Sequence, residues 1–214
     1  MKIFDEFDYI KYKISSSLDV DYLSRDTLDI VDIKEFITDE PSCYINQLEL
    51  NFYGIKENSQ KEIYIGDLFA NHIKINEVEN NDDVGIFDVY DSVDTATFNL
   101  YESIYDIESG FIREDIDIGA NNDILFIYDL VIDPNMVDLD VPELILKRLP
   151  NILRYSRDIW LGAIFYGTHD VNMRRILLES GYHLIEDTNY LYTNPEELGY
   201  YEIDFEIEKD DEDF

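Results

Sequence analysis

The sequence predicts a mixed α/β fold built as a single domain. Two apolar runs in the C-terminal half, Ile124–Ile132 and Asp158–Tyr166, have the length and β-branched content of buried strands, and a helical segment separates them. The N-terminal half contains alternating polar and apolar residues, as in half-buried strands of a hairpin. Strands that alternate with helices favour an α/β class. No linker-like stretch divides the 214 residues, so we predict one domain over residues 1–208.

The N-terminal half predicts three strands and one short helix. Residues 7–14 form the first expected strand, and Ser24 can cap a helix that ends at Ile37. Residues 44–55 show alternation, with Leu48, Leu50 and Phe52 against Glu49, Asn51 and Tyr53, and residues 62–75 form the return strand of a hairpin. Gly66 marks a possible bulge in that return strand.

The middle of the chain predicts a long helix, the central strand and a second helix. Apolar residues recur at spacings of three and four over residues 84–107. The central strand over Ile124–Ile132 ends at Asp133-Pro134, because proline cannot donate to a strand ladder. The next helix is expected over Pro142–Tyr155, with proline in its first turn.

The C-terminal part continues the alternation of strands and helices. Asp170 can cap a helix that runs through Ser180, and Gly181 suits the position just beyond its end. Strands are expected over residues 183–192 and 200–208, followed by an acidic tail over residues 209–214. Residues 84–192 are the best-defined part of this pattern.

The net charge limits the kinds of partner that the protein can bind. The chain has 49 acidic and 16 basic residues, a formal charge of −33. Such a surface repels nucleic acid and anionic membranes and attracts basic partners. A simpler interpretation is that the acidity serves solubility or adaptation to salt. Six basic residues within 29 positions can bind an anion or pair with nearby carboxylates, and we favour internal pairing. They are Lys147, Arg148, Arg154, Arg157, Arg174 and Arg175.

Other features favour a soluble, cytoplasmic protein without a metal. The only cysteine is Cys43, and no apolar run reaches the length of a membrane span. The N-terminus lacks the pattern of a signal peptide. The three histidines, His72, His169 and His183, are isolated from one another, so we expect each to be structural rather than a metal ligand. Asp88, Asp91 and Asp94 step by three and are expected on one solvated helix face.

Four segments resemble the GCN5-related N-acetyltransferase (GNAT) superfamily. They are IFDVYDSVDTATFNLYESIYD, LFIYDLVIDPNM, DIWLGAIFY and RRILLESGYHLIEDTNYLY, all within residues 84–192. The resemblance implies a central mixed sheet flanked by helices. It also implies that Ile124–Ile132 and Asp158–Tyr166 are parallel neighbours joined by a right-handed crossover through the helix from Pro142.

The resemblance fails at the loop that should bind coenzyme A. Family members have glycines there, which let the backbone approach the pyrophosphate at a helix N-terminus. In this chain the loop falls on Val137, Asp138, Leu139, Asp140, Val141 and Pro142. No glycine occurs between Ala120 and Leu161. Two carboxylates near a pyrophosphate repel it by about 1 kcal/mol per charge pair at 4 Å in water, and by more near a protein surface. We therefore expect no cofactor.

A second departure concerns the general acid. The family often has a tyrosine about four residues before its glycine–aromatic pair, and the resemblance places Leu177 there. Leucine cannot donate a proton to a thiolate leaving group. Tyr166, Tyr182 and Tyr190 are nearby in sequence, and we expect them in the core or at its rim. We therefore expect no catalytic residues.

One acidic row is specific enough to suggest a binding face. Carboxylates alternate with apolar residues along the last expected strand, so they lie on one face about 6.8 Å apart. The row consists of Glu202, Asp204, Glu206 and Glu208, with Asp138 and Asp140 as a second candidate patch. This spacing is on the order of the phosphate spacing along a nucleic-acid strand.

These features lead to a leading hypothesis and two alternatives. The leading one is a non-catalytic, acidic GNAT-like protein that binds a basic, nucleic-acid-binding protein as a nucleic-acid mimic. By analogy, its target would be a defence or restriction protein inhibited by a phage or mobile element. The first alternative is an N-acetyltransferase that uses acetyl-coenzyme A on a cationic substrate such as a polyamine. The second is an interaction protein without mimicry.

Overall fold

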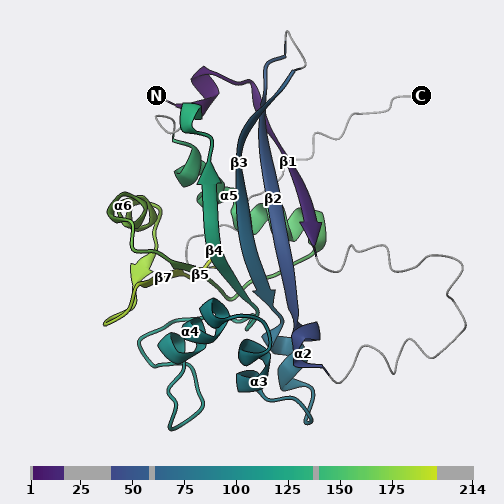
Figure 1. Ribbon diagram of the computed structural model, residues 1–214, viewed down its shortest axis with the longest axis vertical. Helices are drawn as coiled ribbons and strands as arrows, with labels where there is room; N and C mark the ends of the chain where they lie inside the picture. Colours follow the sequence, from purple (N-terminus) through teal and green to yellow (C-terminus); the bar gives the residue numbers. More distant parts are fainter. Residues whose placement is uncertain (1, 17–39, 58–60, 137–139, 197–214) are drawn as a thin grey trace, which may run out of the picture.

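A computed structural model describes residues 2–16, 40–57, 61–136 and 140–196 of the chain. Its described part is built around a seven-stranded mixed sheet with the strand order β1-β2-β3-β4-β5-β7-β6. Figure 1 shows β1 to β4 as long strands, with α5 behind them and α2, α3 and α4 gathered at one end. The predicted mixed α/β class is confirmed.

The first three strands form an antiparallel meander. They are β1 (Tyr9–Ser16), β2 (Ile45–Ile55) and β3 (Glu62–Ile73). The predicted bulge at Gly66 is confirmed, because Phe52 pairs with Gly66 whereas Tyr53 pairs with Tyr64. A Cβ atom at Gly66 would lie 2.3 Å from the carbonyl oxygen of Val131 on β4, so only glycine fits.

The predicted single helix over residues 84–107 is wrong, because the chain forms two helices there. They are α3 (Ile86–Asp91) and α4 (Thr95–Ile104), preceded by the short α2 (Ile75–Glu79). Asp94 has extended backbone angles, and its side chain accepts a 2.7 Å hydrogen bond from the Thr97 N–H. An aspartate in this role starts a new helix. Asp94 is therefore a cap and does not share a helix face with Asp88 and Asp91.

The parallel pairing predicted for the central strand and its neighbour is confirmed. β4 (Ile124–Ile132) pairs in parallel with β5 (Ala163–Gly167), and α5 (Val141–Arg157) lies between them in sequence. A short 3-10 helix, η4 (Pro134–Met136), follows β4. β5 is shorter than predicted, because residues 158–162 turn: Asp158 has a positive φ of 55°, and a Cβ at Gly162 would clash with Asn121.

The last elements are α6 (Val171–Glu179), β6 (His183–Leu184) and β7 (Tyr190–Thr193). The predicted Asp170 cap is confirmed, since its carboxylate accepts hydrogen bonds from the backbone of Asn172 and Met173. The single strand predicted over residues 183–192 is wrong. Asp187 has a positive φ of 61°, and the chain folds there into the β6–β7 hairpin.

The sheet separates two hydrophobic clusters. One cluster joins β2, β3 and β4 to α5 and includes Ile3 and Phe7 of the N-terminal segment, which contains the 3-10 helix η1 (Ile3–Asp5). The other packs α2, α3 and α4 with the 3-10 helix η3 (Pro41–Tyr44) against the opposite face. No helix in the described ranges is both long and apolar enough to cross a membrane.

Several predictions lie outside the described residues. They are the helix over residues 24–37, the strand over residues 200–208, the tail over residues 209–214, and the loop residues Val137, Asp138 and Leu139.

Candidate functional site

The start of α5 is where the resemblance would place a cofactor pyrophosphate. The helix begins at Val141, with Asp140 at its N-cap position and Pro142 in its first turn. Proline removes one of the few N–H groups that a helix N-terminus offers to an anion. Glu143 adds another carboxylate to that first turn.

The N-terminal segment of the chain is bonded to this helix end. The backbone N–H of Ile3 donates a 2.6 Å hydrogen bond to Oδ1 of Asp140. Ile3 and Phe7 are buried, and the Phe7 ring lies over Gly54, where a Cβ atom would be 2.5 Å from it. Figure 1 shows the start of the chain, in purple, beside η4 at the end of β4. The segment is therefore anchored by both a hydrogen bond and buried apolar surface.

The residues present at this helix end do not fit a coenzyme A pyrophosphate. An approaching diphosphate would meet the carboxylates of Asp140 and Glu143, and no glycine allows a close backbone approach. It would also have to displace the hydrogen bond from Ile3. These are three separate obstacles at the position where the superfamily resemblance calls for an anion site.

The residue that replaces the expected general acid is part of the core. Leu177 is fully buried in the cluster beneath α5, so its side chain reaches no solvent-filled site. Tyr166 and Tyr182 are also buried, as expected, whereas Tyr190 lines a cavity. Burial raises the pKa of Tyr166 well above its usual value, with Asp129 and Asp170 adding to the effect.

A cleft opens where β4 and β5 separate. The two strands pair only from Ile124 to Ile127, and beyond that point β4 pairs only with β3. Tyr128 is the additional residue of a bulge there, because Ile127 faces Ala70 while Asp129 faces Phe69. The cavity at this position has a volume of about 400 Å³. We call it the β4–β5 cleft. Its lining residues are Ala96, Asn99, Ser103, Phe126, Tyr128, Gly167, Thr168, His169, Asp187, Thr188, Asn189 and Tyr190.

Three aromatic side chains stand among the mostly polar residues that line the β4–β5 cleft. The Phe126 ring lies 6.3 Å from the Tyr128 ring and 6.0 Å from the Tyr190 ring. Phe69 stacks on Tyr128 with its ring centre at 6.3 Å. Aromatic faces carry negative potential and attract a cationic group that enters between them.

Carboxylates surround the same rings. Burial raises the pKa of Tyr128, and the charges of Asp94, Asp129 and Glu49 raise it further. Burial together with Asp94 also raises the pKa of Tyr190. No lysine or arginine is among the described residues that line the cleft. The cleft is therefore chemically suited to a cation.

The cleft borders the most acidic part of the described structure. Residues 75–123 carry 14 carboxylates and a single basic residue, Arg113, which pairs with Asp115 at 2.8 Å. All of these carboxylates except Asp123 are exposed. The segment contains α2, α3 and α4, and α4 supplies one wall of the cleft. We call residues 75–123 the acidic end.

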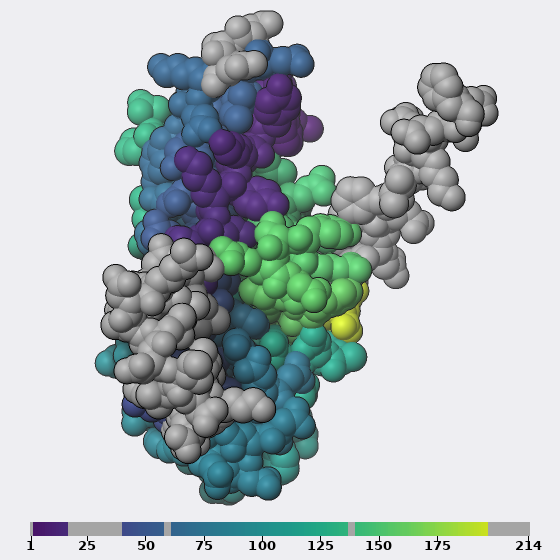
Figure 2. Space-filling model, turned by 90° about the vertical axis from the view of Figure 1, so that its right-hand side faces the viewer, coloured from purple at the N-terminus to yellow at the C-terminus, as the bar shows by residue number. Residues whose placement is uncertain are grey.

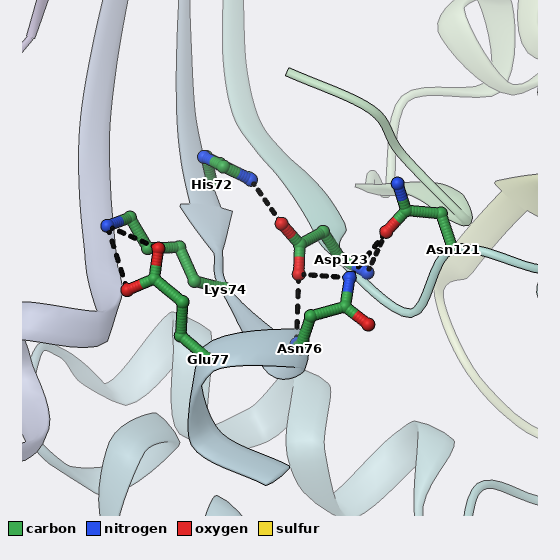
Figure 3. Close-up of polar contacts among 6 residues, drawn as sticks. All are labelled: His72, Lys74, Asn76, Glu77, Asn121 and Asp123. Carbon is green, nitrogen blue, oxygen red and sulfur yellow. Dashed lines mark hydrogen bonds and ion pairs between the residues drawn. The ribbon is translucent and has the colours of Figure 1, made fainter. Parts of the chain in front are cut away.

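A polar network with a second cavity lies where α2 meets the sheet (Figure 3). Oδ1 of Asp123 accepts 3.0 Å hydrogen bonds from both the backbone and the side-chain nitrogen of Asn76, and Oδ2 lies 3.2 Å from Nε2 of His72. The Asn76 side chain also donates to Asn121. Because Asp123 bonds to both neighbours, we interpret the network as a structural tie between α2, β3 and β4.

The other histidines and the basic residues have ordinary roles. His169 is exposed at the cleft, and His183 is exposed on β6. No group of three or more potential metal ligands occurs among the described residues. Lys147 pairs with Glu143, Arg175 pairs with Glu179, and the Arg154 guanidinium stacks 4.0 Å above the Trp160 ring. Internal pairing thus accounts for part of the basic cluster.

The cleft residues were not among the sequence-based site predictions. Nothing distinguishes Tyr128 among 17 tyrosines, because the bulge that orients it depends on its pairing with β3. Of the predicted site residues, Asp140, Val141 and Pro142 are described at the start of α5, and none of them lines the cleft. The acidic row at Glu202, Asp204, Glu206 and Glu208 lies outside the described residues.

Comparisons with known proteins give structural likenesses only. No protein-family model matches the chain, and no curated protein matches it. The solved structures that align with it include the following three. One is a tyrosine-to-phenylalanine mutant of the toxin AtaT bound to the C-terminus of the antitoxin AtaR and acetyl-CoA, at 11% identity and a TM-score of 0.44. It covers 91% of this chain and 98% of the toxin chain.

The other two structures are similarly distant. A complex of KacTA with DNA has 10% identity and a TM-score of 0.40, covering 89% of this chain and 98% of its own. AtaTR bound with acetyl-CoA has 9% identity and a TM-score of 0.42, and the alignment covers 91% of this chain and 99% of the other. We infer no activity or partner from likenesses at this level. The mixed sheet flanked by helices and the parallel β4–β5 pair joined through α5 are what the resemblance implied, and the protein has a GNAT-like fold.

Proposed function

We propose that this protein is a non-catalytic, GNAT-like protein that binds a basic protein surface. The observation that carries the proposal is the β4–β5 cleft beside the acidic end: a cavity with three aromatic side chains in its lining and with carboxylates in and near it. A lysine or arginine side chain of the partner would enter the cleft, and neighbouring basic residues would contact the acidic end.

In its most specific form, the proposal is that the partner surface normally binds nucleic acid. Such surfaces present lysine and arginine at the spacing of phosphates, which rows of carboxylates can imitate. The row at Glu202, Asp204, Glu206 and Glu208 and the loop at Asp138 and Asp140 remain proposed contact patches. A defence or restriction protein is the kind of partner that this form suggests.

The first test concerns acetyl-coenzyme A. Because Asp140, Glu143 and the Ile3 hydrogen bond oppose a pyrophosphate at α5, we expect calorimetry at physiological salt to detect no complex in the micromolar range. A micromolar or tighter complex would remove the reason for proposing a non-enzyme.

The second test uses an arginine-rich peptide as the cationic probe. Asp187 lines the cleft and Asp129 follows Tyr128 on β4, so changing both to Asn removes two charges at or beside the cleft. Changing Asp5 and Glu57 to Asn and Gln removes two exposed charges elsewhere. If each cleft charge contributes about 0.5–1 kcal/mol, the first pair should weaken binding about tenfold and the second pair much less. Equal effects would show that only overall charge matters and would reject the cleft as the anchor.

One observation favours a second candidate function, an N-acetyltransferase for a cationic substrate. The cleft lies at the carboxyl ends of the parallel pair β4 and β5, where α/β folds place ligand sites. Incubation with acetyl-CoA and spermidine, followed by mass spectrometry, distinguishes the two candidate functions. Stoichiometric or greater acetylation of spermidine would support the enzyme, and its absence together with peptide binding supports the first proposal.

A further inference from the structure

Strand β1 forms one edge of the sheet. Among the residues that the structure describes, β1 pairs only with β2, and the sheet order ends there. The outer edge of an eight-residue strand carries backbone N–H and C=O groups that can pair with another strand. Folded proteins usually cover such an edge or place charged residues on it, and β1 carries Lys11 and Lys13.

An apolar groove runs beside this edge. It has a volume of about 320 Å³ and lies between β1 and α5, with Ile10 and Tyr12 on one side and Leu144 and Ile152 on the other. The Tyr12 hydroxyl and the Ser156 hydroxyl on α5 are 2.8 Å apart, so the groove is closed at its base. Figure 2 shows β1 in purple next to α5 in green. The groove would accept apolar side chains from a strand added to β1.

The sequence contains a segment with the matching pattern. In residues 201–208 apolar side chains alternate with carboxylates, as in a strand with one buried face. The apolar set consists of Ile203, Phe205 and Ile207, and the acidic set consists of Glu202, Asp204, Glu206 and Glu208.

The last described residues bring the chain close to the end of β1. The Glu196 carboxylate accepts a hydrogen bond from the backbone of Ala120, and the adjacent Asn121 lines the same cavity as Ser16, the final residue of β1. Residues 197–200 can span roughly 3.4 Å each when extended. In the arrangement proposed below, the chain meets β1 at its Ser16 end and continues toward Tyr9, antiparallel to β1.

We propose that residues 201–208 of this chain add to the outer edge of β1 as an antiparallel eighth strand. One register satisfies both faces of the segment. It places Ile203, Phe205 and Ile207 opposite Ile14, Tyr12 and Ile10, and Asp204 and Glu206 opposite Lys13 and Lys11. The apolar set then covers the groove beside α5, and the acidic set lies on the opposite face of the sheet.

The charges on β1 match this register. Lys11 and Lys13 share one carboxylate, Glu62, at 2.6 and 3.5 Å, and both lysine side chains are about half exposed. The register places the carboxylates of Asp204 and Glu206 directly across from these lysines. Cross-strand contacts between opposite charges are favourable. Arg157 donates to the Ile14 carbonyl, so the added strand takes its main-chain hydrogen bonds at Tyr12 and Ile10.

Engineered cysteine pairs test the register in the full-length chain. In a background with Cys43 changed to Ser, Lys13→Cys with Asp204→Cys should form a disulfide within one chain, because directly opposite residues share a face. Lys13→Cys with Phe205→Cys is the matched control, since its side chains would lie on opposite faces. A disulfide between two chains would assign the edge to a second copy and overturn the proposal, as would equal yields from both pairs.

Hydrogen exchange of the β1 amides provides a second test that needs no cysteine. In an edge strand, alternate N–H groups point outward and exchange quickly, whereas a covered strand protects both sets. We expect both sets to be protected, and the outward set to lose protection when Ile203, Phe205 and Ile207 are all changed to Asp. Fast exchange of the outward set in the unmodified protein would overturn the proposal. Neither test depends on the proposed partner or on the cleft.

Discussion

Asp140 acts as an anchor for the N-terminal segment. Its Oδ1 atom accepts the 2.6 Å hydrogen bond from the backbone of Ile3, and both residues are at least partly shielded from solvent. Changing Asp140 to Ala should therefore lower the free energy of unfolding by about 1.5–3 kcal/mol, since hydrogen bonds to charged groups lie in this range. Urea denaturation measures the change.

Glu143 provides the matched control for Asp140. It is three residues further along the same helix and forms only a surface ion pair with Lys147, so Glu143→Gln should change stability by less than about 0.5 kcal/mol. If Asp140→Ala has an equally small effect, the N-terminal segment is held by apolar packing alone. The obstacle to an anion at α5 would then be reduced to charge and proline.

At the residue scale, the sequence showed which residue types are present near α5, but not which residues contact one another. The carboxylates and the missing glycines near the start of α5 could be recognised from the sequence. The bond from Ile3 to Asp140 could not, because it joins residues 137 positions apart. Tyr128 was missed for the same reason, since its role arises from a bulge in the pairing of β3 with β4.

At the element scale, the division between α3 and α4 depends on a single cap. The Asp94 side chain accepts the Thr97 N–H at 2.7 Å. Asp94→Ala should destabilise the protein by about 1 kcal/mol, the usual value of such a cap. Asp91, an exposed residue at the end of α3, is the control, and Asp91→Ala should remain within about 0.5 kcal/mol of the unmodified protein. Equal losses from the two changes would contradict a capping role for Asp94.

Elements with a long, regular pattern could be predicted from the sequence, and short irregular breaks could not. β4 was predicted to its observed limits, because a buried run closed by Asp133-Pro134 has few alternatives. The break before Asp94 and the turn at Asp187 were missed, because apolar spacing continues across both. In each case a local aspartate conformation overrode a longer periodic pattern.

At the scale of the whole molecule, the charge of −33 should make stability depend on salt. The described ion pairs are few and mostly exposed, so they offset only a small part of the repulsion between carboxylates. Repulsion is strongest at the acidic end, where Arg113 is the only basic residue among 14 carboxylates. Salt screens such charges over a Debye length of about 30 Å at 0.01 M and about 3 Å at 1 M.

We therefore expect the urea midpoint to rise as sodium chloride increases between those concentrations. Urea is suitable because it is uncharged and therefore does not itself screen the charges of the protein. Changing Asp82 and Asp83 to Asn removes two exposed charges from the acidic end, so this variant should be more stable than the unmodified protein at low salt and gain less on adding salt. A midpoint that does not change with salt would mean that the folded chain experiences little net repulsion. The acidic end would then lack the concentrated negative potential that the proposed binding of a basic partner requires.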